Sequence, residues 1–153
     1  MRYRLGPLSD GDARQVARWR YEAPYDTYNV SAEDAQLMTD PAQRFSAVRR
    51  DGALVAYVCL GAEARVSGLV EEAGVEDLGF GLRPDLMGQG LSREILPWLL
   101  SALGEQPVGS RLRVVILDWN ARSLAAYRGA GFTDVGSHTN DNGTYLLLER
   151  ARP

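Results

Sequence analysis

A glycine-bearing turn between an extended run and a helical run is the segment of this sequence best suited to binding a ligand. Residues 78–82 alternate apolar side chains with glycines, Pro84 ends the run, and from Leu91 onward apolar side chains recur at helical spacing. A strand that turns through glycines into a helix exposes backbone N–H groups at the helix N-terminus, where the helix dipole favours negative charge. The sequence therefore predicts a site for a phosphate-bearing ligand.

Two common phosphate-binding motifs are excluded by these residues. The chain contains no lysine, so a P-loop lysine cannot be supplied. The dinucleotide-binding pattern G-x-G-x-x-G fails because its third glycine position holds Pro84 in one frame and Arg93 in the other. The ligand must therefore be held by a different kind of loop.

The turn resembles the acyl-CoA pyrophosphate loop of the GNAT superfamily of N-acetyltransferases. The match is Met87-x-x-Gly90-x-Ser92, where the family usually has Arg/Gln-x-x-Gly-x-Gly/Ala. Met87 and Ser92 depart from that pattern, but backbone amides do most of the binding and Ser92 is small. The alternative is an ordinary strand–turn–helix. The resemblance implies that the pyrophosphate of acetyl-CoA is bound by Met87, Gly88, Gln89, Gly90, Leu91 and Ser92.

A second segment, residues 120–132, resembles the same superfamily. Asn120 opens a helix as a good N-cap, Tyr127 follows seven residues later, and Gly131 suits the left-handed position that ends a helix. The resemblance implies that Tyr127 protonates the departing CoA thiolate and that Asn120 contacts the pantetheine arm. The alternative is a core tyrosine and a simple helix cap.

The order of apolar runs and turn signals predicts the pattern β-α-α-β-β-β-α-β-α-β-β in one domain, residues 1–153. Strands are expected at residues 1–5, 45–50, 54–60, 76–82, 112–117, 133–137 and 144–148, and helices after Ser9, after Ser31, at about 88–103 and after Asn120. This order matches the acetyltransferase fold. It is an α/β (α+β) fold in which helices flank a mixed, mostly antiparallel sheet with two splayed parallel central strands.

In such a fold the thioester is expected between strands 76–82 and 112–117. Backbone groups of Phe80 and Leu82 would pair with the pantetheine amides, and the Leu82 N–H would donate to the thioester carbonyl. Glycines at 79 and 81 would allow close approach of the ligand. Asp77 is the first candidate for the base that deprotonates the amine and Glu76 the second. One alternative is that a chain of water molecules replaces a direct base. The other is that Asp77 and Glu76 are only solvated carboxylates at the edge of the sheet.

Residues 21–29 are expected to form the wall that binds the acceptor. Tyr25 and Tyr28 with Asp26 could hold a cationic amine by cation–π and ion-pair contacts. A tyrosine-rich turn covering the core is the alternative. The acceptor would be a small-molecule or peptide amine whose identity the sequence does not give. The candidates for the CoA 3′-phosphate are Arg93, Arg122 and Arg128.

Composition narrows the class of protein. The chain has 153 residues, 45% of them hydrophobic, and a net charge of −3, which argues against nucleic-acid or membrane partners. With one cysteine and one histidine, we expect no metal site. Because the N-terminus shows no apolar leader, we expect the protein in the cytoplasm. A monomer and a homodimer both stay open. The expected activity is acetyl-CoA-dependent N-acetyl transfer to a primary amine; the rivals are a non-catalytic acyl-CoA-binding regulatory module and a purely structural α/β protein.

Overall fold

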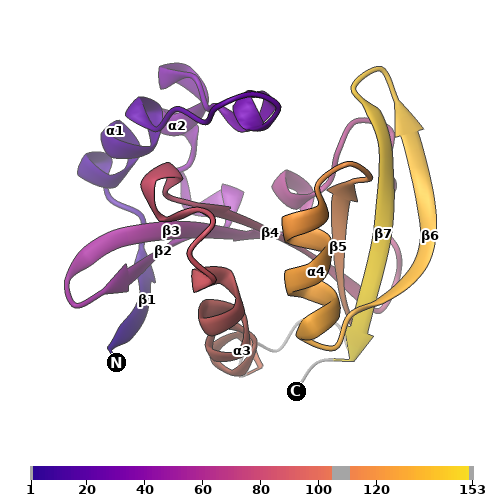
Figure 1. The fold of residues 1–153 in the computed structure, drawn as a ribbon. Helices are drawn as coiled ribbons and strands as arrows, with labels where there is room; N and C mark the ends of the chain where they lie inside the picture. Colours follow the sequence, from indigo (N-terminus) through magenta and orange to yellow (C-terminus); the bar gives the residue numbers. More distant parts are fainter. Residues whose placement is uncertain (1, 105–110, 152–153) are drawn as a thin grey trace. The chain divides into compact units, whose positions relative to one another are not determined.

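The computed structural model describes residues 2–104 and 111–151. The chain divides into two compact units, Met1–Cys59 with Phe80–Gln89, and Leu60–Gly79 with Gly90–Pro153. Strand β4 contributes its first half to the second unit and its end to the first (Figure 1). In the described part of the chain, seven strands follow the order β1-β2-β3-β4-β5-β7-β6.

The observed elements confirm the predicted order of strands and helices. They are β1 (Tyr3–Pro7), α1 (Asp10–Arg18), α2 (Ala32–Leu37), β2 (Phe45–Arg50), β3 (Ala53–Leu60), β4 (Val75–Leu82), α3 (Leu91–Leu103), β5 (Arg111–Leu117), α4 (Ala121–Gly129), β6 (Thr133–Asn140) and β7 (Gly143–Ala151). In the part of the chain that the structure describes, four short 3-10 helices lie between them: η1 (Tyr25–Tyr28), η2 (Pro41–Gln43), η3 (Ala62–Ala64) and η4 (Pro84–Leu86). The mixed, mostly antiparallel sheet with one parallel pair confirms the predicted α/β (α+β) class.

The first unit is built on the antiparallel strands β1, β2 and β3. The β2–β3 hairpin turns at Asp51 and Gly52, both with positive φ (50° and 87°), as a tight Asp-Gly turn requires. Helix α1 begins with a capping box between Ser9 and Asp12. The apolar faces of α1 and α2 meet the strands in one core, made of Leu8, Ala13, Val16, Trp19, Ala35, Met38, Ala47 and Leu54.

The second unit contains the only parallel pairing found in the described residues. Residues Val75 to Asp77 of β4 pair with Arg111 to Arg113 of β5, so the ladder covers only the first three residues of β5. The other edge of β5 is paired with β7 along its whole length, and β7 pairs with β6. Helices α3 and α4 lie side by side (Figure 1). The apolar face of α3 is fully buried.

Several boundaries differ from the sequence prediction. Strand β1 runs from Tyr3 to Pro7, not 1–5, and Met1 lies outside the described residues. Helix α3 begins at Leu91, three residues later than predicted, because Gly88 and Gly90 both have left-handed φ values that a helix cannot contain. Strands β6 and β7 are longer than predicted. No helix within residues 2–104 and 111–151 is long and apolar enough to cross a membrane.

Candidate functional site

The glycine-bearing turn leads into α3 without a capping side chain. Residues 87–90 form turns, with φ of 76° at Gly88 and 74° at Gly90. Gly90 precedes the first helical residue, Leu91, and the described residues provide no side-chain cap at this end of α3. The first N–H groups of a helix have no intrahelical acceptor, and the dipole adds positive potential there. The observed turn therefore has the features on which the phosphate prediction rests.

The far end of β4 is fixed by three hydrogen bonds within the first unit. The Tyr21 hydroxyl donates to the Leu82 carbonyl oxygen at 2.6 Å. The backbone N–H of Arg83 donates to the Val55 oxygen at 2.8 Å, and the Arg83 guanidinium donates to the Leu54 oxygen at 2.8 Å. The backbone around Leu82, the predicted donor to the thioester, is therefore held from two directions.

Gly81 lies against the ring of Tyr57. A Cβ added at Gly81 would stand 2.2 Å from Cζ of Tyr57, so only glycine fits there. The Tyr57 ring is itself fixed, stacked on Trp19 with 6.1 Å between centroids and tilted against Phe45 at 5.9 Å. Gly81 thus permits the close approach of a tyrosine ring, and the approach of a ligand at Gly79 and Gly81 stays a prediction.

Asp77 is held by two arginines inside the second unit and is only 2% exposed. Its carboxylate accepts hydrogen bonds from Nε and Nη2 of Arg113, at 2.6 and 3.2 Å, and from Nη1 of Arg65 at 3.0 Å. The hydrogen bond to Asp77 raises the pKa of Arg113 against the opposing effect of burial, so this arginine stays charged. Both oxygens of this carboxylate are therefore occupied by charge-assisted hydrogen bonds. These contacts favour a role for Asp77 as an anchor of β4 over a role as the base. The role as base stays a prediction.

Glu76 occupies the opposite face of the same strand. Side chains alternate along a strand, so Glu76 shares a face with Leu78 and Phe80, whereas the two arginines lie on the Asp77 face. Glu76 is also buried. The two carboxylates therefore lie in different surroundings, and the role of Glu76 as base stays a prediction.

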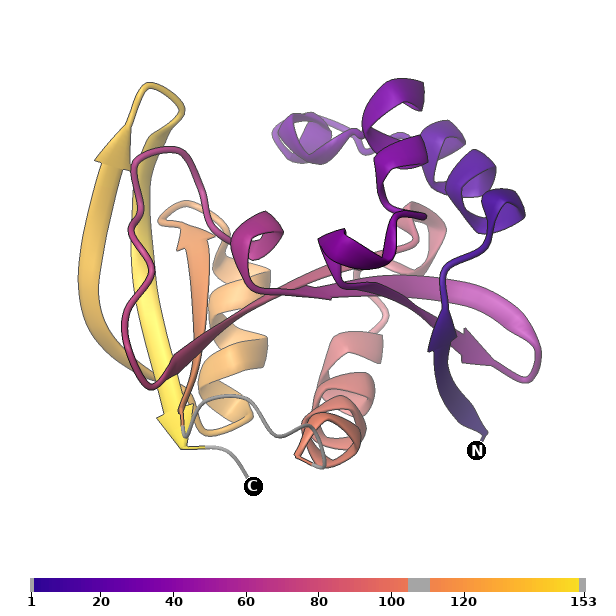
Figure 2. The same cartoon turned by 180° about the vertical axis from the view of Figure 1, so that it is seen from behind.

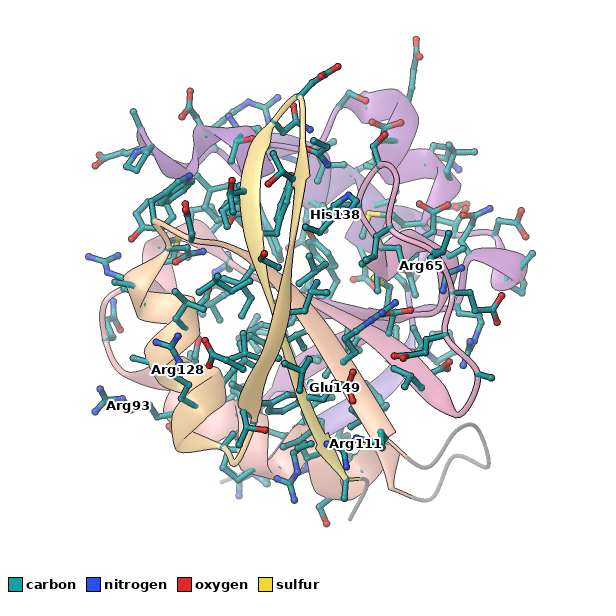
Figure 3. All side chains as sticks on the ribbon, turned by 90° about the vertical axis from the view of Figure 1, so that its right-hand side faces the viewer. Arg65, Arg93, Arg111, Arg128, His138 and Glu149 are labelled. Atoms are coloured by element: carbon teal, nitrogen blue, oxygen red, sulfur yellow. The ribbon has the colours of Figure 1, made fainter. Side chains whose placement is uncertain are left out.

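The segment between β3 and β4, residues 61–74, is tied to the rest of the second unit at several points. Arg113 also donates to the Val70 carbonyl at 3.0 Å. The Ser67 carbonyl accepts from the Asn140 amide at 3.1 Å and lies 2.9 Å from Nε2 of His138. Figure 2 shows this segment running beside the β6–β7 hairpin, and Figure 3 shows His138 on that hairpin. The single histidine thus contacts a backbone carbonyl, which no local sequence signal indicated.

The local predictions for α4 are confirmed. The side chain of Asn120 accepts a hydrogen bond from the Ser123 N–H at 3.2 Å and so caps the helix. Gly131 has φ of 95°, in the left-handed region. Tyr127 is buried and packs edge-to-face on Phe132, with 5.3 Å between centroids. The roles of Tyr127 as acid and of Asn120 in binding pantetheine stay predictions.

The predicted acceptor segment is a closed loop in the first unit. The backbone N–H of Tyr21 donates to Oδ1 of Asn29 at 2.8 Å and joins the two ends of the loop. Between them lies η1, in which Asp26 is exposed and Tyr25 and Tyr28 are half-buried. The sequence placed Tyr21 and Asn29 at the two ends of this segment but gave no sign of the hydrogen bond that joins them. Binding by Tyr25, Tyr28 and Asp26 stays a prediction.

The three arginines predicted for the CoA 3′-phosphate differ in their surroundings. Arg128 makes two hydrogen bonds to Asp134, the shorter 2.7 Å, so its guanidinium already pairs with a carboxylate. Arg93 is exposed in the first turn of α3, directly after the glycine turn (Figure 3). Arg122 is exposed on α4. Of the three arginines, the position of Arg93 next to the glycine turn best suits the predicted contact with the CoA 3′-phosphate. Among residues 2–104 and 111–151, no group of three or more His, Cys, Asp or Glu side chains could hold a metal ion.

The chain belongs to the acetyltransferase (GNAT) family, whose profile matches residues 12–132. The match includes both segments on which the sequence resemblance rests, the glycine turn and residues 120–132. A comparison with curated protein sequences finds no significant match.

Solved structures of acetyltransferases share the fold. The aminoglycoside acetyltransferase AAC(6′)-Ib in complex with coenzyme A aligns with a TM-score of 0.80 and 19% identity, over 99% of this chain and 95% of that one. A spermidine N-acetyltransferase SpeG chimera from Vibrio cholerae and hSSAT aligns at 0.75 and 15%, over 99% and 96%. A GNAT-family acetyltransferase from Bacillus anthracis aligns at 0.76 and 12%, over 99% and 96%. At these identities the likeness establishes the fold alone.

Proposed function

We propose that this protein transfers an acetyl group from acetyl-CoA to a primary amine, by direct attack of the amine in a ternary complex. The observation that carries the proposal is the turn with Gly88 and Gly90 that leads into α3 without a side-chain cap, in a chain of the GNAT family. The rival is a non-catalytic module that binds acyl-CoA on the same fold. A tyrosine at the family's acid position, Tyr127, favours the enzyme.

Acetyl-CoA is bound mainly by backbone groups in this proposal. The N–H groups of the turn and the first turn of α3 hold the pyrophosphate, and strand β4 pairs with the pantetheine arm. The proposed contacts are Phe80, Leu82, Met87, Gly88, Gln89, Gly90, Leu91, Ser92, Asn120 and Tyr127. Arg93 is our choice for the 3′-phosphate, because it follows the turn directly. The two departures from the family pattern, Met87 and Ser92, are tolerable because neither removes a backbone N–H.

An ammonium acceptor loses two protons in this reaction, and the CoA thiolate takes up one. The neutral amine nitrogen forms a bond to the acetyl carbon while the Leu82 N–H stabilises charge on the carbonyl oxygen. The carbon–sulfur bond then breaks, and the CoA thiolate takes a proton from Tyr127. The attacking nitrogen loses its second proton as the amide forms, and that proton returns to Tyr127 through water. The proton of the incoming ammonium passes to Glu76, directly or through water. We assign the base to Glu76 because Asp77 already accepts from Arg113 and Arg65.

The acceptor is a cationic amine bound by the loop of residues 21–29. Residues 21–43 contain five carboxylates and no basic residue: Glu22, Asp26, Glu33, Asp34 and Asp40. All five are exposed. Such a segment attracts positive charge, and the half-buried rings of Tyr25 and Tyr28 add cation–π contacts. Two structural neighbours are an aminoglycoside acetyltransferase and a spermidine N-acetyltransferase chimera, and both kinds of acceptor carry several amines, which supports this choice.

Release of free thiol from acetyl-CoA in the presence of an amine panel tests the proposal. The panel contains polyamines, aminoglycosides, amino acids and short peptides, and each is compared with a blank without protein. We expect thiol release with at least one amine that carries two or more positive charges. Tight CoA binding without turnover on any amine would support the non-catalytic module.

Two variants of Gly90 test how acetyl-CoA is bound. At 100 times its Kd, CoA should stabilise the wild type by about 2.7 kcal/mol and raise its Tm. Gly90→Asp should abolish that shift because it places a negative charge against phosphate. Gly90→Ala is the matched control: it suffers the same left-handed strain, and its Cβ would meet nothing within 4 Å, so it should keep the shift. Stabilisation of the wild type by NADH or ATP and not by CoA would overturn the assignment.

A further inference from the structure

Tyr21 makes two hydrogen bonds that join two parts of the first unit. Its backbone N–H donates to Oδ1 of Asn29 at 2.8 Å and closes the loop of residues 21–29. Its side-chain hydroxyl donates to the Leu82 carbonyl oxygen at 2.6 Å, at the end of β4. The loop proposed to bind the acceptor is thus attached to the strand residue proposed to activate the thioester.

The Tyr21 phenol is suited to donate this hydrogen bond and not to act as a base. Burial, and then the nearby Tyr57 hydroxyl, raise the pKa of Tyr21 above its ordinary value. The neighbouring Tyr57 ring is held in place, because it fills the space beside Gly81 and stacks on Trp19. The hydroxyl therefore stays protonated and its donor position is fixed by packing.

The hydrogen bond acts on the orientation of Leu82. The Leu82 carbonyl accepts from Tyr21, and the next N–H, that of Arg83, donates to Val55 at 2.8 Å. Both sides of the Leu82–Arg83 peptide are therefore held, which limits rotation at Leu82. A catalytic group displaced by about 1 Å can lose on the order of 10²-fold in rate, so small losses of order here matter.

We infer that Tyr21 is a positioning residue that couples the acceptor loop to the backbone donor at Leu82. The inference rests on the proposed function. Tyr21 itself touches neither the acetyl group nor the amine. Through its hydroxyl it orients Leu82, and through its N–H and Asn29 it fixes the loop that delivers the amine.

The test is Tyr21→Phe, which keeps the ring and deletes only the hydroxyl. We expect kcat to fall roughly 10-fold, consistent with the loss of one neutral hydrogen bond, while the CoA Kd changes less than two-fold. Tyr145→Phe is the matched control: it is a buried tyrosine of β7 outside the proposed site, and it should keep the wild-type kcat. Asn29→Ala should mainly raise the acceptor KM, because it opens the loop and leaves the Leu82 hydrogen bond in place.

A double variant separates positioning from general destabilisation. If Tyr21 couples the two sites, Tyr21→Phe with Asn29→Ala should lose clearly less kcat/KM than the product of the single losses. If the wild type acetylates an amine and Tyr21→Phe keeps kcat within two-fold of it, the inference about Tyr21 is wrong and the proposed function still holds. Multiplicative losses in the double variant overturn the coupling. A wild type with no turnover on any amine overturns the proposed function, and the inference with it.

Discussion

The two ends of strand β4 are held in opposite ways. Near its start, Asp77 is a buried charge that accepts hydrogen bonds from Arg113 and Arg65. At its end, the Leu82 carbonyl accepts one hydrogen bond from a neutral tyrosine, Tyr21. The titratable residue that a sequence first suggests for chemistry is thus fully occupied by partners. The apolar residue, Leu82, offers backbone groups that can act on a substrate. Residue type alone therefore does not locate the chemistry.

The variant Asp77→Asn tests whether the charge of Asp77 anchors this end of β4. It keeps the shape of the side chain and removes its charge. The buried guanidinium of Arg113 and the half-buried one of Arg65 would lose this carboxylate partner, so we expect about 3–5 kcal/mol of lost stability, measured by denaturant unfolding. Asp51→Asn is the matched control, because the Arg2–Asp51 pair is exposed and should contribute only about 0–1 kcal/mol. If Asp77→Asn keeps wild-type stability but loses acetyl transfer, Asp77 is the base and the comparison is wrong.

Tyr127→Phe tests whether a buried hydroxyl of the second unit acts on rate and not on stability. The variant keeps the ring that packs on Phe132 and deletes only the proposed proton donor. We expect kcat to fall by about 10²-fold, the low end for general-acid catalysis, with CoA affinity unchanged. If kcat stays within about a factor of three of wild type when chemistry is rate-limiting, solvent supplies the proton and Tyr127 is a packing residue.

Gly81→Ala tests the rigidity of the Leu82 end. The new methyl group would overlap the Tyr57 ring, which is packed between Trp19 and Phe45, so we expect a loss of about 1–3 kcal/mol. Gly6→Ala is the control in the same unit, because its Cβ would meet nothing within 4 Å. Adding Tyr57→Leu should recover part of the loss. A neutral Gly81→Ala would show that the Tyr57 ring moves freely and does not hold this end of β4.

Asp12 extends the comparison to a buried carboxylate with a single arginine partner. Asp12 is buried and accepts from the guanidinium of Arg49 at 2.6 Å and from the Ser9 backbone at 2.9 Å. Burial alone would raise the pKa of Asp12, but the hydrogen bonds from Ser9 and Arg49 outweigh it and hold the pKa below its ordinary value. The folded state therefore binds this proton less readily than the unfolded chain does.

The sign of the pH effect follows from that shift. A lowered folded-state pKa stabilises the protein fully above the unfolded value, near 3.9, and the contribution disappears as pH falls through the folded value. Asp12→Asn should thus cost about 1–2 kcal/mol at pH 7, and the gap from wild type should close below about pH 4. Unfolding midpoints of the wild type and Asp12→Asn at several pH values measure this difference in stability. A gap that stays constant down to pH 2 would contradict the assignment.

Local signals in the sequence were sufficient for much of the fold. The helix start after Ser9, the N-cap Asn120 and the left-handed Gly131 are each decided by a few neighbouring residues, and the structure confirms all three. The start of α3 was misplaced because apolar spacing alone does not show that Gly88 and Gly90 adopt left-handed angles.

The contacts of the candidate site were not predictable in the same way. Asp77 meets Arg113, which lies 36 positions further along the chain, and the Tyr57 ring meets Gly81 from another strand. Such contacts depend on sheet register and packing, which no short pattern encodes. The sequence could name Asp77 and Glu76 as neighbours with opposite faces, but only the structure shows which face carries the arginines.

The central claim, acetyl transfer from acetyl-CoA to an amine, is tested most directly by a mass balance. The wild type is incubated with acetyl-CoA and the most active amine of the panel, and free CoA and acetylated amine are both quantified by mass spectrometry. We predict equal amounts of the two products, at a rate well above the blank without protein. CoA released without acetylated amine would mean hydrolysis, and no release despite bound CoA would mean a non-catalytic module; either result would contradict the account.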